Sequence, residues 1–457
     1  MRFFLNSSKS PTLLVRLVPG TEEYFIQQAK QLILVLGFDS KEDMTLRKLR
    51  LLVRKTVQLA KGKQISDIGF TFSEWQFREL KLEEAALGEM MVVNLLLADY
   101  AFTRYKTPPQ EGFPSLKRVS FLGVQHEKSF REALRRAHII GEEVNAARSI
   151  ANEPAGTMTP DHLVRHAKVA CKALPIELTV FDTKRLKREN MSGIMAVGQG
   201  SKAQPRFVIA EYRAGKKSEA PIVLVGKGVT FDSGGINLKP SDAILGMNMD
   251  MSGAATVLHT LCAAARLGLK ENIIALIPAV ENMISGESYR PGDIICTASG
   301  KTIEVQNTDA EGRIILSDAL HFARRYNPSL VIDVATLTGA SMVALGERAT
   351  ALFTEDEQLE SQLRHIGMRV GDPVWPLPLW DEYLEDIKGT YADIGNVGTT
   401  RYGGAITAAL FLKQFIDYPW VHLDIAPRMV ATAGENLAKG SLGAGVQLLV
   451  RFLLEKK

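Results

Sequence analysis

Seven ionisable side chains that could bind cations or anions lie in three short segments, GKGVTFDSGGINLKP, MNMDMSGAA and NTDAEGR. They are Lys227, Asp232, Lys239, Asp250, Asp309, Glu311 and Arg313. The acids among them carry four negative charges, which two divalent cations would balance. That balance requires Lys227, if it is a ligand, to bind as a neutral amine.

The third segment places Asp309, Glu311 and Arg313 at alternate positions, just before the apolar pattern that begins at Ile314. Alternate side chains share a face in extended backbone, so two carboxylates and a guanidinium would converge and hold cations and an anion together. The alternative is helix capping, because acids are favoured at helix starts.

Asp250 is open to two interpretations. It is flanked by methionines and small residues ahead of an apolar helical pattern, where an isolated carboxylate is costly unless it is paired or ligating. It could instead be the N-cap of that helix.

The acids alone would also permit a phosphoryl-transfer enzyme with two Mg²⁺ ions, although the phosphate-cradling pattern G-x-x-x-x-G-K-[ST] is absent from the first segment.

The elements around these segments predict an α/β fold. The apolar run from Pro221 to Val225 reads as a buried strand that leads into the first segment, and TIEVQN leads into the third. Strand patterns such as IELTVF, FVIAEYR, IIALIPAV, LVIDVATL and WVHLDIA alternate with helical patterns such as TVLHTLCAAARLG. This alternation predicts a mixed sheet sandwiched by helices, with chemistry just beyond the carboxyl ends of its strands.

The N-terminal part predicts a smaller α/β domain. Helical patterns cover Thr21 to Leu36, Glu83 to Tyr100 and Glu127 to Ile150, and RVSFLGV reads as a strand. We expect domains at residues 1–140 and 141–457, the first serving assembly or regulation and the second catalysis.

Composition narrows the class of protein. The 457 residues are 46% hydrophobic and carry a net charge of only +4, which gives little support to nucleic-acid binding. We expect the three cysteines, Cys171, Cys262 and Cys296, to be buried and reduced. The early apolar run from Leu32 to Leu36 is far shorter than the ~20 residues that span a bilayer, so a cytoplasmic protein without a membrane partner is expected.

Beyond these patterns, the three segments resemble the signature blocks of the cytosol (leucyl) aminopeptidase family, together with SGESYRPGDI, NEPAGTMTP, ATLTGA and HLDIA. The similarity runs from about residue 145 almost to the end. It implies a dinuclear metallo-exopeptidase that removes N-terminal residues from peptides with a free amino terminus, usually as a homohexamer. Some bacterial relatives also bind DNA, a role that the near-neutral charge does not favour.

The resemblance also implies roles for individual residues. Five match the family's metal ligands: Lys227, Asp232, Asp250, Asp309 and Glu311. Lys239 matches the lysine that polarises the scissile carbonyl, and Arg313 matches the arginine that holds a bicarbonate acting as proton shuttle. The two ions would be Mn²⁺ or Zn²⁺, with a metal-bridged hydroxide as the nucleophile.

Four further positions match the substrate pocket: Met247, Thr336, Leu337 and Gly339. A methionine wall tolerates varied apolar guests, so a broad preference including Leu and Met is expected. Two departures from the family pattern affect this pocket. The segment Ser441 to Gly445 replaces a Thr-Gly-Arg-Pro turn, and Pro427 stands where the family has glycine, so the far wall and the side-chain preference are open.

Overall fold

The computed structural model describes residues 1–456, which divide into two compact units. The first unit comprises Met1–Asn145 and Ala431–Lys439, and the second comprises Ala146–Val430 and Gly440–Lys457. The expected boundary near residue 140 lies inside one continuous helix, α3 (Glu127–Ala151). The return of residues 431–439 to the first unit was not anticipated from the sequence.

The first unit contains a six-stranded sheet in the order β1-β6-β5-β2-β4-β3, in which β3 is antiparallel to β4 and the other neighbours are parallel. Its elements are β1 (Arg2–Leu5), β2 (Leu13–Pro19), β3 (Glu23–Gln28), β4 (Gln31–Phe38), α1 (Leu46–Gly62), β5 (Asp67–Thr71), η1 (Phe72–Trp75), η2 (Arg78–Leu80), α2 (Glu84–Asp99) and β6 (Arg118–Leu122). The expected helix at 83–100 and the strand at RVSFLGV are therefore present.

The helix expected from Thr21 to Leu36 is wrong, because this stretch forms the β3–β4 hairpin. Gln28 pairs with Gln31, and Ala29 takes a left-handed conformation with φ 51° in the tight turn between them. The run from Ile33 to Leu36 is buried in a strand held between β2 and β3. Pairing on both edges and the β-branched residues of this run outweigh a spacing that also fits a helix.

The second unit contains a nine-stranded mixed sheet, as expected. Eight strands follow the order β16-β15-β18-β14-β9-β11-β8-β7, and β10 pairs with β11. They are β7 (Ile176–Phe181), β8 (Arg206–Arg213), β9 (Ile222–Gly226), β10 (Gly228–Asp232), β11 (Asn272–Asn282), β14 (Leu330–Ala335), β15 (Thr350–Phe353), β16 (Val374–Pro376) and β18 (Trp420–Asp424). A small sheet joins β12 (Ile294–Cys296), β13 (Thr302–Glu304) and β17 (Ile394–Gly395).

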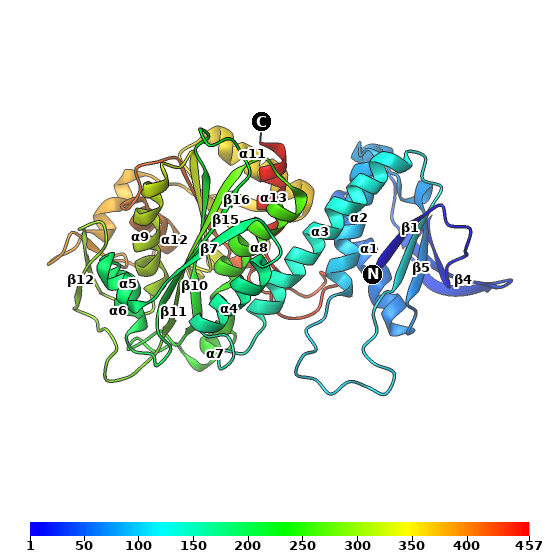
Figure 1. Cartoon of the computed structure of the whole chain (residues 1–457). Coiled ribbons are helices and arrows are strands. Elements are labelled where there is room, and N and C mark those ends of the chain that lie inside the picture. The colour runs from blue at the N-terminus through cyan, green and yellow to red at the C-terminus, as the bar shows by residue number, and fades with distance from the viewer. Residues whose placement is uncertain (457) are drawn as a thin grey trace. The chain divides into compact units, whose positions relative to one another are not determined.

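Helices cover both faces of this large sheet (Figure 1). One face carries α5 (Thr183–Arg188), α6 (Ser192–Gly198), α9 (Glu311–Ala323) and α12 (Gly404–Lys413). The other carries α4 (Pro160–Cys171), α8 (Ser252–Leu267), α11 (Glu357–Val370) and α13 (Val446–Glu455). The remaining helical segments are α7 (Ser241–Ile244), η3 (Met247–Met249), η4 (Arg324–Tyr326), α10 (Gly339–Leu345), η5 (Asp381–Ile387) and η6 (Ala426–Arg428).

The central strands β9, β11 and β14 are almost wholly buried between these layers. A strand covered on both faces needs apolar side chains at nearly every position, which explains the continuous runs IVLV and IIALI. Because β9 and β14 are parallel neighbours, the backbone that follows them emerges at one edge of the sheet. That edge carries the side chains of the candidate site.

Two further expectations concern the cysteines and membrane-spanning helices. Cys171 and Cys262 are buried and not in a disulfide, as expected, but Cys296 is exposed, because it lies on the outward face at the end of the short strand β12. Within residues 1–456, helices that combine the length and the apolar character needed to cross a bilayer are absent.

Candidate metal and active site

The carboxyl edge of the large sheet brings together side chains from all three sequence segments. Lys227 connects β9 to β10, Asp232 ends β10, and Asp250 lies between η3 and α8. Asp309 and Glu311 lie where the chain enters α9. The backbone N–H of Lys227 donates to the carbonyl of Val334 at 3.0 Å, which fixes the β9 exit against β14.

Lys227 is the centre of one half of the cluster. Its ammonium lies 3.0 Å from Asp250 Oδ1 and 2.8 Å from Glu311 Oε1, and it donates to the carbonyl oxygen of Thr336 at 2.8 Å. Burial disfavours its charge, but the carboxylates, Asp250 foremost, outweigh burial and raise the pKa of Lys227 above the ordinary lysine value.

Lys239 is the centre of the other half. Its Nζ lies 2.8 Å from Asp232 Oδ2 and 2.6 Å from Asp309 Oδ1. Burial opposes the charge here too, and the carboxylates, led by Asp232, raise the pKa of Lys239. The carboxylates of Asp232 and Asp309 therefore favour the positively charged form of Lys239.

The acids meet closely enough to share a cation. Ligand oxygens of Asp232, Asp309 and Glu311 all lie within 4.8 Å of one another. Asp250 Oδ2 and Glu311 Oε2 are buried and accept no hydrogen bond from any residue between 1 and 456. Burial raises the pKa of Asp250 and of Glu311, against the lowering effect of the Lys227 charge. Orphaned carboxylate oxygens are costly in protein interiors, and hard divalent cations prefer oxygen donors, so this donor set fits metal ions.

The capping alternatives are resolved by the helix boundaries. Helix α9 begins at Glu311, so Glu311 and Arg313 lie in its first turn and the expected extended spacing of this segment is wrong. The N-cap of α9 is Ala310, which has no capping side chain, and the N-cap of α8 is Met251. Neither Asp309 nor Asp250 is therefore a helix cap.

Arg313 presents a buried guanidinium at the same helix start. Its Nη1 donates to the carbonyl of Asn396 at 2.7 Å, whereas its Nε finds no acceptor within residues 1–456. Burial lowers the pKa of Arg313 to about 10, against the opposing charges of Glu311 and Asp424. Spare donors on a buried cation are suited to holding a small anion.

The expected substrate residues lie on two neighbouring segments. Thr336 follows β14 and donates through Oγ1 to Asp250 Oδ1 at 2.6 Å, so it contacts the acidic cluster directly. Leu337 is half-buried, and the exposed Gly339 opens α10. Met247 opens η3, which packs against β10.

Asp424 is a residue that the sequence reasoning missed. It ends β18 and is 1% exposed. Its Oδ1 accepts the backbone N–H of Leu337 at 3.0 Å, and its Oδ2 accepts the hydroxyl of Thr338 at 2.7 Å. Thr338 in turn caps α10 by accepting the N–H of Ser341. A single buried carboxylate thus fixes the loop that carries Thr336, Leu337 and Gly339, and the only signal in the sequence was an acid at the end of a strand.

The sequence reasoning also missed Gly312, which matters because it is small, and Asn282, which matters through its hydrogen bonds. A Cβ on Gly312 would lie 2.6 Å from Lys227 Cε and 2.7 Å from its Nζ, so glycine makes room for the lysine at the start of α9. Asn282 donates to Asp232 Oδ1 at 2.8 Å and to the carbonyl of Thr308 at 2.9 Å, which ties the first and third segments together.

The departures from the family pattern have structural positions. Residues 441–445 are buried, and the Ala444 carbonyl accepts the Thr256 hydroxyl of α8 at 2.7 Å. The Gly445 N–H donates to Asp372 Oδ2 at 2.6 Å and leads into α13. Pro427 lies in the first turn of η6, where a missing N–H costs nothing.

Comparisons with known proteins agree with this geometry. The cytosol aminopeptidase catalytic-domain model matches residues 145–450, and the N-terminal-domain model matches residues 8–109. A probable cytosol aminopeptidase of Syntrophotalea carbinolica is 44% identical over 386 residues, covering 82% of this chain and 78% of the relative. One from Burkholderia mallei is 44% identical over 398 residues, covering 86% and 78%.

Solved structures show the same fold. The bottromycin maturation enzyme BotP superposes with a TM-score of 0.87 at 29% identity, covering 97% of this chain and 99% of that one. The same enzyme in complex with Mn gives a TM-score of 0.88 over the same shares of the two chains. The matched models span more than half of the chain and include the whole acidic cluster. The chain therefore belongs to the cytosol aminopeptidase family, and the resemblance read from its three charged segments is confirmed.

Proposed function

We propose that this protein is a leucyl-type aminopeptidase that hydrolyses the first peptide bond of peptides with a free amino terminus, using two divalent cations, Mn²⁺ or Zn²⁺. The observation that carries the proposal is the convergence of four acids and two lysines, with buried carboxylate oxygens that lack a partner. When bound, two such ions would lower the pKa of a bound water toward neutrality and polarise the scissile carbonyl. The manganese complex of BotP, a structural relative, supports this choice of ions.

In this proposal Asp232, Asp250, Asp309 and Glu311 hold the ions. Lys227, an ammonium between Asp250 and Glu311 in the metal-free site, would lose its proton when metal binds and join them as a neutral amine. Thr336 keeps Asp250 in place through its 2.6 Å hydrogen bond, and Asn282 does the same for Asp232. Asp250 Oδ2 accepts no hydrogen bond from residues 1–456, whereas Asp232 Oδ2 is paired with Lys239 at 2.8 Å. Buried ligands that are oriented by neighbours bind metal more tightly than free ones.

Lys239 and Arg313 serve the chemical step. Water adds across the peptide bond: its oxygen bonds to the carbonyl carbon, the C–N bond breaks, and the departing amine takes a proton. The ammonium of Lys239 stabilises the negative charge that develops on the carbonyl oxygen. Arg313, with its unpaired Nε, would hold a bicarbonate that carries the proton to the amine.

Met247, Thr336, Leu337 and Gly339 line the pocket for the first side chain, and the Leu337 carbonyl anchors the substrate. We expect a broad preference that includes Leu and Met. The protein would act in the cytoplasm as a homohexamer, with residues 1–140 serving assembly or regulation. The names of its relatives, which are probable cytosol aminopeptidases, support this location.

The experiment is hydrolysis of leucyl p-nitroanilide by the purified full chain, before chelation, after chelation, and after Mn²⁺ or Zn²⁺ is added back. We expect activity that is lost on chelation and restored by metal. N-acetyl-leucyl p-nitroanilide is the matched control, because it lacks the free amine and should not be cleaved. Cleavage of the acetylated substrate at the same rate would refute an exopeptidase, and turnover of p-nitrophenyl phosphate alone would favour phosphoryl transfer.

A further inference from the structure

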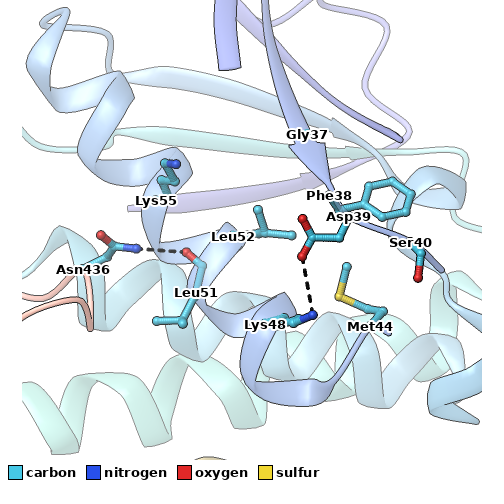
Figure 2. Close-up of a pocket in the computed structure, with 10 residues that line it drawn as sticks. All are labelled: Gly37, Phe38, Asp39, Ser40, Met44, Lys48, Leu51, Leu52, Lys55 and Asn436. Carbon is cyan, nitrogen blue, oxygen red and sulfur yellow. Dashed lines mark hydrogen bonds and ion pairs between the residues drawn. The ribbon is translucent and has the colours of Figure 1, made fainter. Parts of the chain in front are cut away.

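A cavity of about 260 Å³ lies within the first unit, where β4 ends and α1 begins (Figure 2). Asp39 and Ser40 form its rim directly after β4, Met44 lines it just before α1, and Lys48 and Leu52 line it from α1 itself. Strand β4 runs parallel to its neighbour β2, so the cavity at the end of β4 lies at the carboxyl end of a parallel strand. Open α/β sheets favour ligands at this position.

The lining mixes apolar and polar residues. Phe38 is 7% exposed, Met44 is 5% exposed and Leu52 of α1 is half-buried, and the polar side chains of Asp39, Ser40 and Lys48 line the same cavity. The apolar part of this surface suits a short aliphatic or thioether side chain. A volume of about 260 Å³ lies just below the usual range for ligand pockets, which favours a small ligand.

The rim carries one pair of opposite charges that is only loosely engaged. Asp39 Oδ2 and Lys48 Nζ face each other at 3.5 Å, beyond ordinary hydrogen-bond length, and their side chains are 66% and 48% exposed. The other lining lysine, Lys55, forms an ion pair with Glu23 on β3 and lies on the Asn436 side of the pocket. Asp39 and Lys48 are therefore the charges that can turn toward a ligand.

We propose that this cavity binds a free apolar α-amino acid as a zwitterion, with its ammonium on Asp39, its carboxylate on Lys48 and its side chain among Phe38, Met44 and Leu52. A phosphate or another pure anion would meet Asp39 as a like charge. A wholly apolar ligand would leave both rim charges without new partners. A zwitterion matches both charges and the interior at once.

That this amino acid is a product of the enzyme rests on the proposed function. The binding of the amino acid to the pocket does not depend on that function. An exopeptidase releases the class of molecule that fits this site. Occupancy by leucine or methionine would then report the product concentration to the first unit.

The test follows Met44 directly by NMR, using the full chain labelled with ¹³C at its methionine methyl groups. The Met44 signal is assigned with Met44→Leu, and L-leucine is titrated in. We expect a saturable shift of the Met44 signal. N-acetyl-L-leucine lacks the ammonium, and 3-methylbutylamine lacks the carboxylate and has no amide bond to cleave, so each should bind at least roughly tenfold more weakly, as expected for one lost charge-assisted hydrogen bond.

Variants separate the pocket from other sites. Lys48→Gln should weaken leucine binding at Met44 by roughly tenfold or more, because it removes the carboxylate partner. Arg47→Gln is the matched control, since it removes a positive charge from an exposed position on the same turn of α1 outside the cavity, and it should leave the affinity unchanged.

The proposal would be overturned by an unchanged Met44 signal in the wild-type protein, by analogues with a single charge that bind as tightly as leucine, or by equal affinity in Lys48→Gln and Arg47→Gln. A protein that shows the Met44 shift but does not hydrolyse leucyl amides would refute the proposed function and keep the pocket. A shift of Met247 alone would place leucine in the second unit and also overturn the proposal.

Discussion

Replacing Asp424 with asparagine should weaken substrate binding without removing metal. The carboxylate accepts the Leu337 N–H at 3.0 Å and the Thr338 hydroxyl at 2.7 Å, and both bonds would pass from a charged to a neutral acceptor or be lost. Bonds to charged groups contribute about 1.5–3 kcal/mol and neutral ones about 0.5–1.5 kcal/mol, so two bonds cost about 2 kcal/mol together.

That cost should appear in the kinetics of peptide hydrolysis. A loss of about 2 kcal/mol corresponds to roughly a 30-fold lower kcat/KM, expressed mainly as a higher KM, because the loop positions substrate and does not touch the reacting bond. The assay is steady-state hydrolysis of leucyl p-nitroanilide, with metal content measured on the same samples by mass spectrometry. A double-mutant cycle with Thr338→Val isolates the hydroxyl bond.

The reasoning would be refuted by an Asp424→Asn enzyme with unchanged kcat/KM. It would also be refuted if the variant lost its metal, since the change would then reach Asp250 through Thr336 and would not be confined to substrate binding. Thermal unfolding of the variant checks that the fold remains.

Four further predictions concern other residues of the second unit. Glu311→Ala should abolish activity and weaken metal retention, and normal turnover with full metal content would show that Glu311 is not a metal ligand. Lys239→Ala should lower kcat by about 10²–10³ while metal stays bound, as for loss of an oxyanion donor, and an unchanged kcat would contradict its role. Gly312→Ala should displace Lys227, whose Nζ would lie 2.7 Å from the new Cβ, and so reduce both activity and metal content; an active, fully loaded variant would show that the lysine can move aside. The fourth concerns His422, whose pKa is lowered by burial but raised overall by Asp333, 2.6 Å away; its stabilising effect is therefore full below the unfolded pKa and lost as pH rises through the folded pKa. His422→Gln should flatten the decline in the free energy of unfolding as the pH rises above the ordinary histidine pKa of 6.5, measured by denaturant titration, and an identical decline in both proteins would contradict this.

Much of the catalytic unit could be predicted from the sequence because local patterns and strand order agree there. Buried runs such as Ile222–Gly226 have apolar residues at every position, and such strands end at one edge of a parallel sheet. Asp232 and Glu311 were therefore expected to meet, although they lie far apart in the chain. Strand ends and helix starts position these side chains.

What the sequence did not predict depends on distant partners. The β3–β4 hairpin forms because β4 pairs with β2 on its other edge, which a window of 16 residues does not reveal. Asp424 matters through Leu337, 87 residues away, and Gly312 through the stem of Lys227. Residues 431–439 join the first unit from the far end of the chain. None of these contacts has a local signature.

The proposed cation pair can be tested most directly by anomalous X-ray scattering from crystals of the full chain grown with Mn²⁺ or Zn²⁺, recorded at the absorption edge of the metal. We predict two peaks per subunit, both enclosed by Asp232, Asp250, Asp309 and Glu311. A single peak, or peaks that contact none of these acids, would contradict the account.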